Sequence, residues 1–298
     1  MKRGSRGADH RARRAAGPAA AVARPVRARS GSPTHYPRAR KRFGQHFLEP
    51  AWVAKLIDAL AVAAGDRFLE IGPGRGALTR PLAARASGVV AVEIDRDLAA
   101  ALGAEALPRV RVVTGDFPHL DLDEVLAAER GPLRVVGNLP YNVASPILFR
   151  LLTAADDGRR FSDATLMLQK EVADRLAARP GTADYGSLAI QVGLVATVER
   201  VLTLPPGAFR PPPKVTSAVV RFVFHPPREE VGDRGVFERV VRGLFLHRRK
   251  TLLNALTPVA ASLDRTAAEA IERAGLDPTR RPGTLALEDI ARLTRAML

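Results

Sequence analysis

Between residue 50 and about residue 225, short apolar runs alternate with segments of helical periodicity, and this alternation limits the possible folds more than any other feature. The apolar runs are rich in valine, isoleucine and leucine, and several end in glycine or a polar residue. Strands that alternate with helices form a mostly parallel sheet covered by helices on both faces. We therefore predict an α/β fold with a doubly wound sheet.

Strands are expected at the apolar runs, and helices are expected at the periodic segments between them. Strands are predicted over residues 67–71, 88–94, 110–114, 133–136, 164–168 and 215–224, with one long or two short strands over 190–204. Helices are predicted over 51–64, 78–86, 98–106 and 122–129, and from 170 onward.

The pattern changes after Pro226-Pro227, because beyond these prolines and a polar stretch only helical periodicity remains. Helices are predicted over 236–247, 249–256, 266–274 and 287–297. We expect a catalytic domain over residues 38–227 and a small all-helical domain over 234–298.

Charge is concentrated at the two ends of the chain. The 298 residues carry a formal net charge of +15, with 13 basic residues and one acid in residues 1–42. Residues 43–233 hold 21 basic and 23 acidic residues, and residues 234–298 hold 12 and 7. This distribution suits a polyanionic partner. The absence of cysteine excludes disulfides, thiolate catalysis and cysteine-ligated metals, and no apolar run is long enough to span a membrane.

The N-terminal 40 residues contain no Leu, Ile, Phe or Trp and cannot form a core. We expect a disordered basic tail over residues 1–37. It is interpreted as an arm that attracts RNA phosphates, as an Arg-rich organelle transit peptide or as an extension without a role. It lacks the apolar segment of a secretory signal.

A glycine-rich turn follows the first predicted strand of the sheet. Gly72, Gly74 and Gly76 stand at alternate positions, which lets the backbone approach a ligand closely. Glu93 ends the next strand, where a carboxylate can accept both ribose hydroxyls, and Asp116 ends the third strand on the same edge. This set predicts a pocket for an adenosine-containing cofactor. Glycines spaced G-x-G-x-G depart from the dinucleotide pattern, so a nicotinamide dinucleotide and S-adenosylmethionine both stay possible at this point.

The fourth strand runs into Asn138-Leu139-Pro140-Tyr141. The Asn138 side-chain oxygen and the Leu139 carbonyl can both accept from a planar amino group, while Tyr141 can stack on the attached base. Such a site holds an adenine N6 amine in line with a sulfonium methyl group, so most of the rate comes from proximity and desolvation. No general base or metal is needed, which favours S-adenosylmethionine. The alternative is an ordinary strand-to-helix turn.

Two further features suggest contact with RNA. Phe209 lies in a proline-framed loop and is either a stacking platform for an extruded base or a core anchor. The run Arg248-Arg249-Lys250 is predicted to open a helix and to bind phosphates, with a solvated helix face as the alternative.

In combination, these residues resemble the ribosomal RNA adenine N6-dimethyltransferase family. The resemblance covers about residues 38–298 and rests on Arg40–Leu48, Glu70–Gly74, Asn138–Asn142, Leu168–Val172, Phe209–Arg221 and Arg248–Thr251. It implies a class I methyltransferase fold with a seven-stranded, Rossmann-like sheet. It also implies transfer of two methyl groups to each of two adjacent adenines near the 3′ end of 16S rRNA, with a role in small-subunit biogenesis.

The resemblance also implies residue roles. His46 and Leu48 line the methionine side of the cofactor, and Gly72 lies beneath it. Glu93 holds the ribose, Asp116 faces the adenine, and Asn138 lies between the cofactor and the target amine. His46 is a departure, since many bacterial members have Asn there.

Other functions remain as alternatives to small-subunit methylation. A sister group methylates large-subunit rRNA and confers macrolide resistance, and the triple-proline segment and the Arg248–Thr251 block favour the small-subunit enzymes instead. A non-catalytic assembly factor and an oxidoreductase are further alternatives. We expect a cytoplasmic monomer that acts on the pre-30S particle, with no metal and no membrane partner.

Overall fold

The computed structural model describes residues 46–141, 143–155 and 160–298. These residues belong to one compact unit, Tyr36–Leu298. The expected basic tail over residues 1–37 lies outside the described residues.

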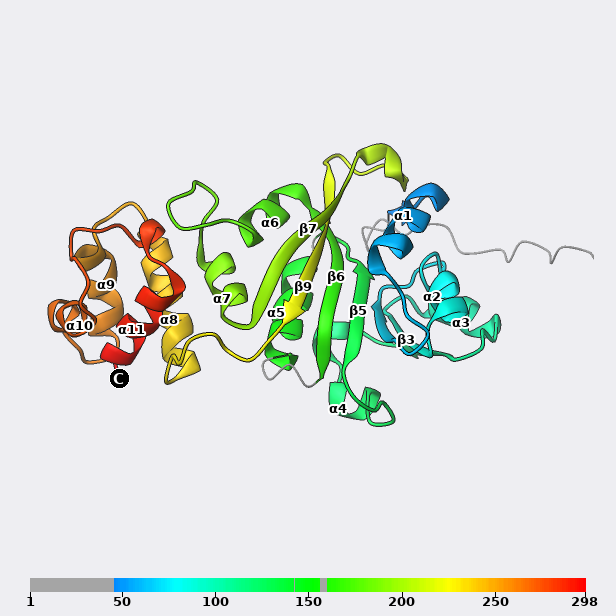
Figure 1. The fold of residues 1–298 in the computed structure, drawn as a ribbon, viewed down its shortest axis with the longest axis horizontal. Coiled ribbons are helices and arrows are strands. Elements are labelled where there is room, and N and C mark those ends of the chain that lie inside the picture. The colour runs from blue at the N-terminus through cyan, green and yellow to red at the C-terminus, as the bar shows by residue number, and fades with distance from the viewer. Residues whose placement is uncertain (1–45, 142, 156–159) are drawn as a thin grey trace, which may run out of the picture. The chain divides into compact units, whose positions relative to one another are not determined.

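The described residues form a seven-stranded sheet with the strand order β4-β3-β2-β5-β6-β9-β7 (Figure 1). The strands are β2 (Arg67–Ile71), β3 (Gly88–Glu93), β4 (Val110–Thr114), β5 (Leu133–Asn138), β6 (Phe161–Gln169), β7 (Ala196–Leu204) and β9 (Ser217–Phe224). The strands from β4 to β6 pair in parallel, and β9 pairs antiparallel with both β6 and β7. The predicted doubly wound, mostly parallel sheet of seven strands is confirmed.

Alternate residues of the central strands point to opposite faces of the sheet, as the two-residue period of a strand requires. Leu69 and Val135 belong to one hydrophobic cluster, together with residues of α5 (Ala144–Ala154), α6 (Lys170–Leu176) and α7 (Ser187–Val195). Their neighbours Phe68 and Val136 belong to a second cluster. That cluster includes residues of α1 (Pro50–Leu60) and α2 (Thr79–Arg85). Both faces of the sheet are therefore covered, which explains why adjacent residues of these strands, such as Phe68 and Leu69, are both apolar.

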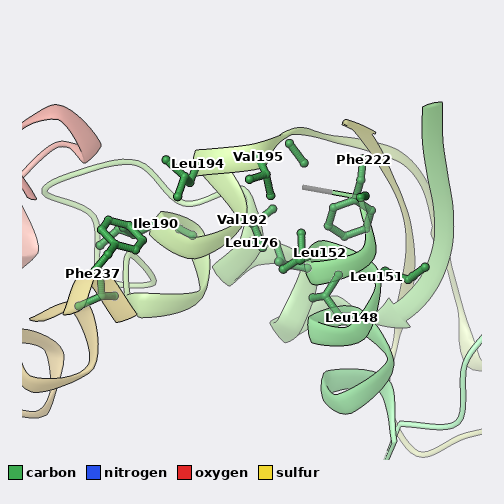
Figure 2. Packing of buried hydrophobic residues seen from close by; sticks show 14 of the residues in the cluster. Leu148, Leu151, Leu152, Leu176, Ile190, Val192, Leu194, Val195, Phe222 and Phe237 are labelled. Atoms are coloured by element: carbon green, nitrogen blue, oxygen red, sulfur yellow. The ribbon is translucent and has the colours of Figure 1, made fainter. Parts of the chain in front are cut away.

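The segment predicted as one or two strands over residues 190–204 is in part a helix, so this prediction is corrected. α7 (Ser187–Val195) occupies its first half and β7 (Ala196–Leu204) its second. Figure 2 shows Ile190, Val192, Leu194 and Val195 packed between neighbouring elements. A helix that is buried on several sides lacks an amphipathic period, so its sequence resembles that of a buried strand.

Other elements differ from the prediction in extent. The helix α3 (Arg96–Ala104) and the short α4 (Leu122–Val125) follow β3 and β4 as expected. The helix α5, for which no prediction was made, follows the Asn138–Tyr141 turn. A separate two-stranded sheet pairs β1 (Phe47–Leu48) with β8 (Phe209–Arg210).

Four helices complete the chain, as predicted. They are α8 (Arg234–Leu246), α9 (Leu252–Ala261), α10 (Ala267–Arg273) and α11 (Leu287–Ala296). The start of α9 lies later than expected, because the Thr251 hydroxyl caps it by accepting from the Asn254 amide. Phe237 of α8 packs near Ile190 of α7 in one shared hydrophobic cluster (Figure 2). The division into separate domains at residues 227 and 234 stays a prediction.

Candidate functional site

A cavity of about 330 Å³ opens at the carboxyl ends of the parallel strands. This is the edge at which ligands bind in open α/β sheets. Its lining contains most of the residues that the sequence singled out: His46, Leu48, Gly72, Gly74, Glu93, Asp116, Asn138, Leu139, Pro140 and Tyr141. The structure thus brings together side chains and turns from five separate segments. Phe209 and the basic run at residues 248–250 are not part of this lining.

The glycine turn after β2 forms the floor of the cavity. Gly72, Gly74 and Gly76 adopt φ angles of +71°, +57° and +73°, a region that favours glycine. A Cβ atom on Gly74 would lie 3.2 Å from the Phe47 ring. A side chain at Gly74 is therefore disfavoured both by the backbone conformation and by the Phe47 ring. The peptide groups of the turn stay accessible to a ligand.

Glu93 is almost completely buried at the end of β3, with 4% of its surface exposed. One carboxylate oxygen accepts from the Gly74 amide at 2.9 Å, and the other accepts from the Asp95 amide at 2.9 Å. Burial raises the pKa of Glu93. The carboxylate therefore holds the glycine turn against the end of β3. Because each oxygen has a second lone pair, it can also accept from a ligand hydroxyl.

Asp116 follows β4 in a different environment, with 46% of its side chain exposed. Its carboxylate lies 2.8 Å from the imidazole Nδ1 of His119. Asp116 lines the open side of the cavity, and its predicted contact with the adenine of a cofactor stays a prediction.

Glu70 is a site residue to which the sequence analysis assigned no role. It lies in β2 directly before the glycine turn, lines the cavity and is only 2% exposed. Burial is the main cause that raises its pKa to about 7, and the nearby charge of Glu93 acts in the same direction. Its Oε2 has no hydrogen-bond partner among the described residues. A lone acid within the apolar strand was the sequence signal that could have identified it.

Three carboxyl groups therefore line one cavity: Glu70, Glu93 and Asp116. Two of them are buried, where an unpaired negative charge is costly. The cavity is thus suited to a ligand that carries positive charge, because a cation would compensate for the burial of these acids.

Asn138, the last residue of β5, holds a fixed orientation. Its Nδ2 donates to the backbone carbonyl of His46 at 2.7 Å. A carbonyl oxygen can only accept, so the amide nitrogen must face it and Oδ1 is left as an acceptor. The following turn is closed by a hydrogen bond from the Val143 amide to the Pro140 carbonyl at 3.1 Å.

Tyr141 is half-buried, and its hydroxyl hydrogen-bonds to the hydroxyl of Ser217 at 2.5 Å. Burial raises the pKa of Tyr141. Its ring stacks against the His46 imidazole, with a centroid separation of 6.0 Å. These contacts hold the aromatic ring beside the Asn138 turn and within the cavity lining.

Phe209 lies in β8 with 1% of its surface exposed, packed in the cluster that contains Leu48 and Val219. Leu48 of β1 is its register partner. The structure therefore places this ring in the core instead of at the cavity, in agreement with the core-anchor alternative. A stacking role would require the ring to leave its present position.

The basic run lies in the turn between α8 and α9, and does not open a helix as predicted. Arg249 and Lys250 are exposed. Arg248 is half-buried and donates to the Ala183 carbonyl at 2.9 Å, so it anchors the loop before α7. The predicted phosphate contacts stay a prediction, with Arg249 and Lys250 the more accessible of the three.

The described residues contain neither a cluster suited to a metal ion nor a helix suited to a membrane. In residues 46–298, apart from 142 and 156–159, no group of three or more His, Asp or Glu side chains could hold a metal ion. None of the described helices is long and apolar enough to cross a membrane.

Comparison with known sequences gives extensive matches. The chain matches the family described as "Ribosomal RNA adenine dimethylase" over residues 37–294. It is 46% identical over 267 residues to "Ribosomal RNA small subunit methyltransferase A" of Geobacter metallireducens, which covers 88% of this chain and 96% of that protein. The protein of the same name from Myxococcus xanthus is 45% identical, with 88% and 92% covered.

Solved structures are similar over a comparable length. A dimethyladenosine transferase from Plasmodium falciparum matches with a TM-score of 0.70 at 26% identity, covering 83% of this chain and 96% of that chain. The 23S rRNA methyltransferase ErmE matches with a TM-score of 0.60 at 27% identity, covering 84% and 99%.

Proposed function

The chain belongs to the ribosomal RNA adenine dimethylase family, and from this premise we propose that it dimethylates the N6 amines of two adjacent adenines in small-subunit rRNA. The methyl donor is S-adenosylmethionine, and the target loop lies near the 3′ end of 16S rRNA. The observation that carries the proposal is one cavity in which an oriented Asn138 amide and three carboxyl groups meet.

The choice of subunit follows from the curated relatives. Those from Geobacter metallireducens and Myxococcus xanthus, at 46% and 45% identity, are named for the small subunit. The ErmE structure is named for 23S rRNA, but its identity to this chain is 27%. Small-subunit methylation is therefore the better supported activity, and it connects the protein to biogenesis of that subunit.

The cavity fits S-adenosylmethionine better than a nicotinamide dinucleotide. A sulfonium carries positive charge, which complements Glu70, Glu93 and Asp116. A pyrophosphate would instead add negative charge beside these acids. Gly72 and Gly74 would lie against the cofactor, Glu93 and Asp116 would hold its ribose and adenine, and His46 and Leu48 would line its methionine side.

The chemistry needs little more than positioning. When bound, the cofactor supplies an electrophilic methyl group. The Asn138 Oδ1 and the Leu139 carbonyl accept from the adenine N6 hydrogens and hold that nitrogen in place, while Tyr141 supplies a face for the base. As N6 forms its new bond to the methyl carbon, the carbon–sulfur bond would break, S-adenosylhomocysteine would leave with a neutral sulfur, and N6 would lose one proton to solvent. The monomethylated amine keeps one N–H, so only one of the two acceptors would hold it during the second transfer.

In the proposal, RNA also contacts the turn between α8 and α9, outside the cavity. Arg249 and Lys250 bind phosphates there, which fixes the position of the RNA on the protein without reading its sequence. Arg248 contributes less, because its guanidinium already donates to Ala183. We place this activity in the cytoplasm and assign it to a monomer.

A direct test combines ligand binding with product analysis. Calorimetric titration should show binding of S-adenosylmethionine and no binding of NAD. Small and large ribosomal subunits that lack the modification are then incubated separately with labelled S-adenosylmethionine. Mass spectrometry of digested RNA should find dimethyladenosine only in the small subunit. Label in the large subunit, or a lone monomethyl product, would contradict the proposal.

A further inference from the structure

His46 is the residue that connects the N-terminal segment to the two loops around the target site. Its Nδ1 lies 2.7 Å from the Pro211 carbonyl oxygen, its ring stacks against Tyr141, and its own carbonyl accepts from Asn138. Tyr141 and Asn138 are the two side chains to which the proposed function assigns the target base. His46 therefore contacts both, and does so from a segment more than 90 residues earlier in the chain.

The orientation of the His46 ring follows from its partner. A carbonyl oxygen accepts only, so Nδ1 must carry the hydrogen, and in the neutral imidazole Nε2 is then an acceptor. The contact with Pro211 fixes the ring plane, and the ring in turn lies at 26° to Tyr141.

Tyr141 is consequently restrained at two points. Its hydroxyl is held by Ser217 at the start of β9, and its ring is supported by His46. A hydroxyl contact by itself leaves the ring free to rotate about the line to that oxygen. The imidazole removes this freedom, so the plane offered to a base is defined before the base arrives.

The contacts of His46 with Pro211 and Tyr141 join protein groups to each other and do not require a bound methyl donor. A residue whose only role was to touch the donor would not need these two contacts. The pairing of β1 with β8, in which Phe47 is the register partner of Arg210, holds His46 beside Pro211.

We propose that His46 is a positioning residue for the target adenine: its side chain sets the plane of Tyr141, while its backbone carbonyl, which side-chain substitutions keep, orients the Asn138 amide. This inference rests on the proposed function and deepens it, since the family resemblance gave His46 a place at the methionine side of the donor only. Loss of His46 should therefore reduce turnover with RNA more than affinity for the donor.

Two substitutions test the side-chain part of this role. His46→Ala removes the ring and the donor to Pro211, and His46→Phe keeps a ring against Tyr141. His225→Ala is the matched control, because His225 also places Nδ1 2.8 Å from a proline carbonyl but does not line the cavity. Thermal melting of each variant checks that it is folded.

The kinetic experiment measures kcat and KM with small subunits, and the Kd of S-adenosylmethionine by calorimetry without RNA. His46→Ala should lower kcat about tenfold and raise the donor Kd by a clearly smaller factor, because the side chain also lines the donor's methionine side in the proposed function. His46→Phe should recover most of kcat, and His225→Ala should match the wild type. Adding His46→Ala to Tyr141→Leu should cause little further loss of kcat, because both substitutions disrupt the same stacked pair of rings. A tenfold rise in donor Kd with unchanged kcat, or losses that multiply in the double variant, would overturn the proposal.

A second readout does not depend on activity. An RNA hairpin with 2-aminopurine at the target position reports stacking through quenching of its fluorescence. The wild type and His46→Phe should quench it, and His46→Ala should quench it substantially less. Equal quenching by His46→Ala would contradict the role in base positioning. Absence of methylation by the wild type would overturn the proposed function instead.

Discussion

The side-chain nitrogen of Asn138 lies 2.7 Å from the backbone carbonyl oxygen of His46. The bond decides which end of the amide stays available, and it leaves the oxygen as an acceptor. In the proposed mechanism this oxygen accepts from the adenine amine, and the bond to His46 orients it before RNA binds. Preorganisation of this kind would supply the rate in a mechanism that uses no general base.

Asn138→Ala should lower kcat by about 10²–10³-fold, since one of two acceptors for the N6 amine is lost. Asn138→Asp should be at least as damaging, because a carboxylate cannot donate to the His46 carbonyl. The donor Kd should change by less than threefold in the alanine variant. Single-turnover methylation of small subunits measures the effect, with Asn254→Ala on the exposed side of α9 as a control. Normal turnover by Asn138→Ala would contradict the mechanism.

Binding of S-adenosylmethionine should strengthen as the pH rises from 6 to 8. The pKa of Glu70 is raised to about 7, so the carboxyl changes from mostly neutral to mostly charged over this range. The charged form attracts a sulfonium, and the affinity should rise by up to about tenfold. S-adenosylhomocysteine, whose sulfur is neutral, should show a weaker dependence. Calorimetry at five pH values tests this, and Glu70→Gln should flatten the profile.

The same carboxyl group should reduce the stability of the ligand-free protein at high pH. Its pKa in the folded state is about 7, compared with an ordinary value of 4.5, so the folded state favours the neutral form. Stability from this group is present below pH 4.5 and is lost as the pH rises through 7. Glu70→Gln should therefore stabilise the protein at pH 8 by up to about 3 kcal/mol and have little effect near pH 4.5. Urea unfolding of the wild type and Glu70→Gln at both pH values measures this difference. An equal change in the free energy of unfolding at the two pH values would contradict the prediction.

Asp163 should be the most sensitive carboxylate for folding. It is buried in β6 and bonds to Arg134 at 3.0 Å and to Arg221 at 2.8 Å. Asp163→Ala leaves two arginines without this partner and should cost about 3–5 kcal/mol. Asp123→Ala breaks the ion pair with Arg160 but should cost less than about 1 kcal/mol, because the Asp123 side chain is 80% exposed. Comparable losses in chemical denaturation would contradict this ranking.

Charge reversal at Arg249 and Lys250 should weaken binding to small subunits without changing donor affinity. Each phosphate contact that is lost should reduce the slope of log K against log salt by about one. Filter binding at several salt concentrations measures both quantities. Arg85→Glu, an exposed charge at the end of α2, serves as the control for net charge. An unchanged slope in the double reversal would remove this turn from the RNA contact surface.

Much of the fold follows from local pattern. The predicted limits of β2 and β4 agree with the structure residue for residue, because each is a short apolar run bounded by polar residues or glycine. The segment 190–204 was misassigned, because α7 is buried by α8 as well as by the sheet and lost the amphipathic period that would mark a helix. Propensity is a weak guide once packing surrounds an element.

The residues of the candidate site also differ in how far the sequence alone predicts their roles. Asn138, Glu93 and Asp116 were recognised because each lies at or just after the end of a strand, and the carboxyl ends of parallel strands meet at one edge. Phe209 was open to two interpretations, since its neighbouring prolines indicate a rigid loop but not the direction of the ring. Glu70 received no role, because a lone acid in an apolar strand marks it only as unusual. Its neighbours in space reveal that it is buried and that its Oε2 has no hydrogen-bond partner in the described part of the chain.

The sequence by itself determined the order of strands and helices from α1 to β5, the glycine turn and the Asn138–Tyr141 turn, because all of these depend on residues close together in the chain. Tertiary structure decided that Phe209 faces the core, that Glu70 is buried at the cavity and that His46 contacts Tyr141. These contacts join residues far apart in the chain, and burial depends on everything packed around a side chain. Neither is encoded in any local pattern of residues.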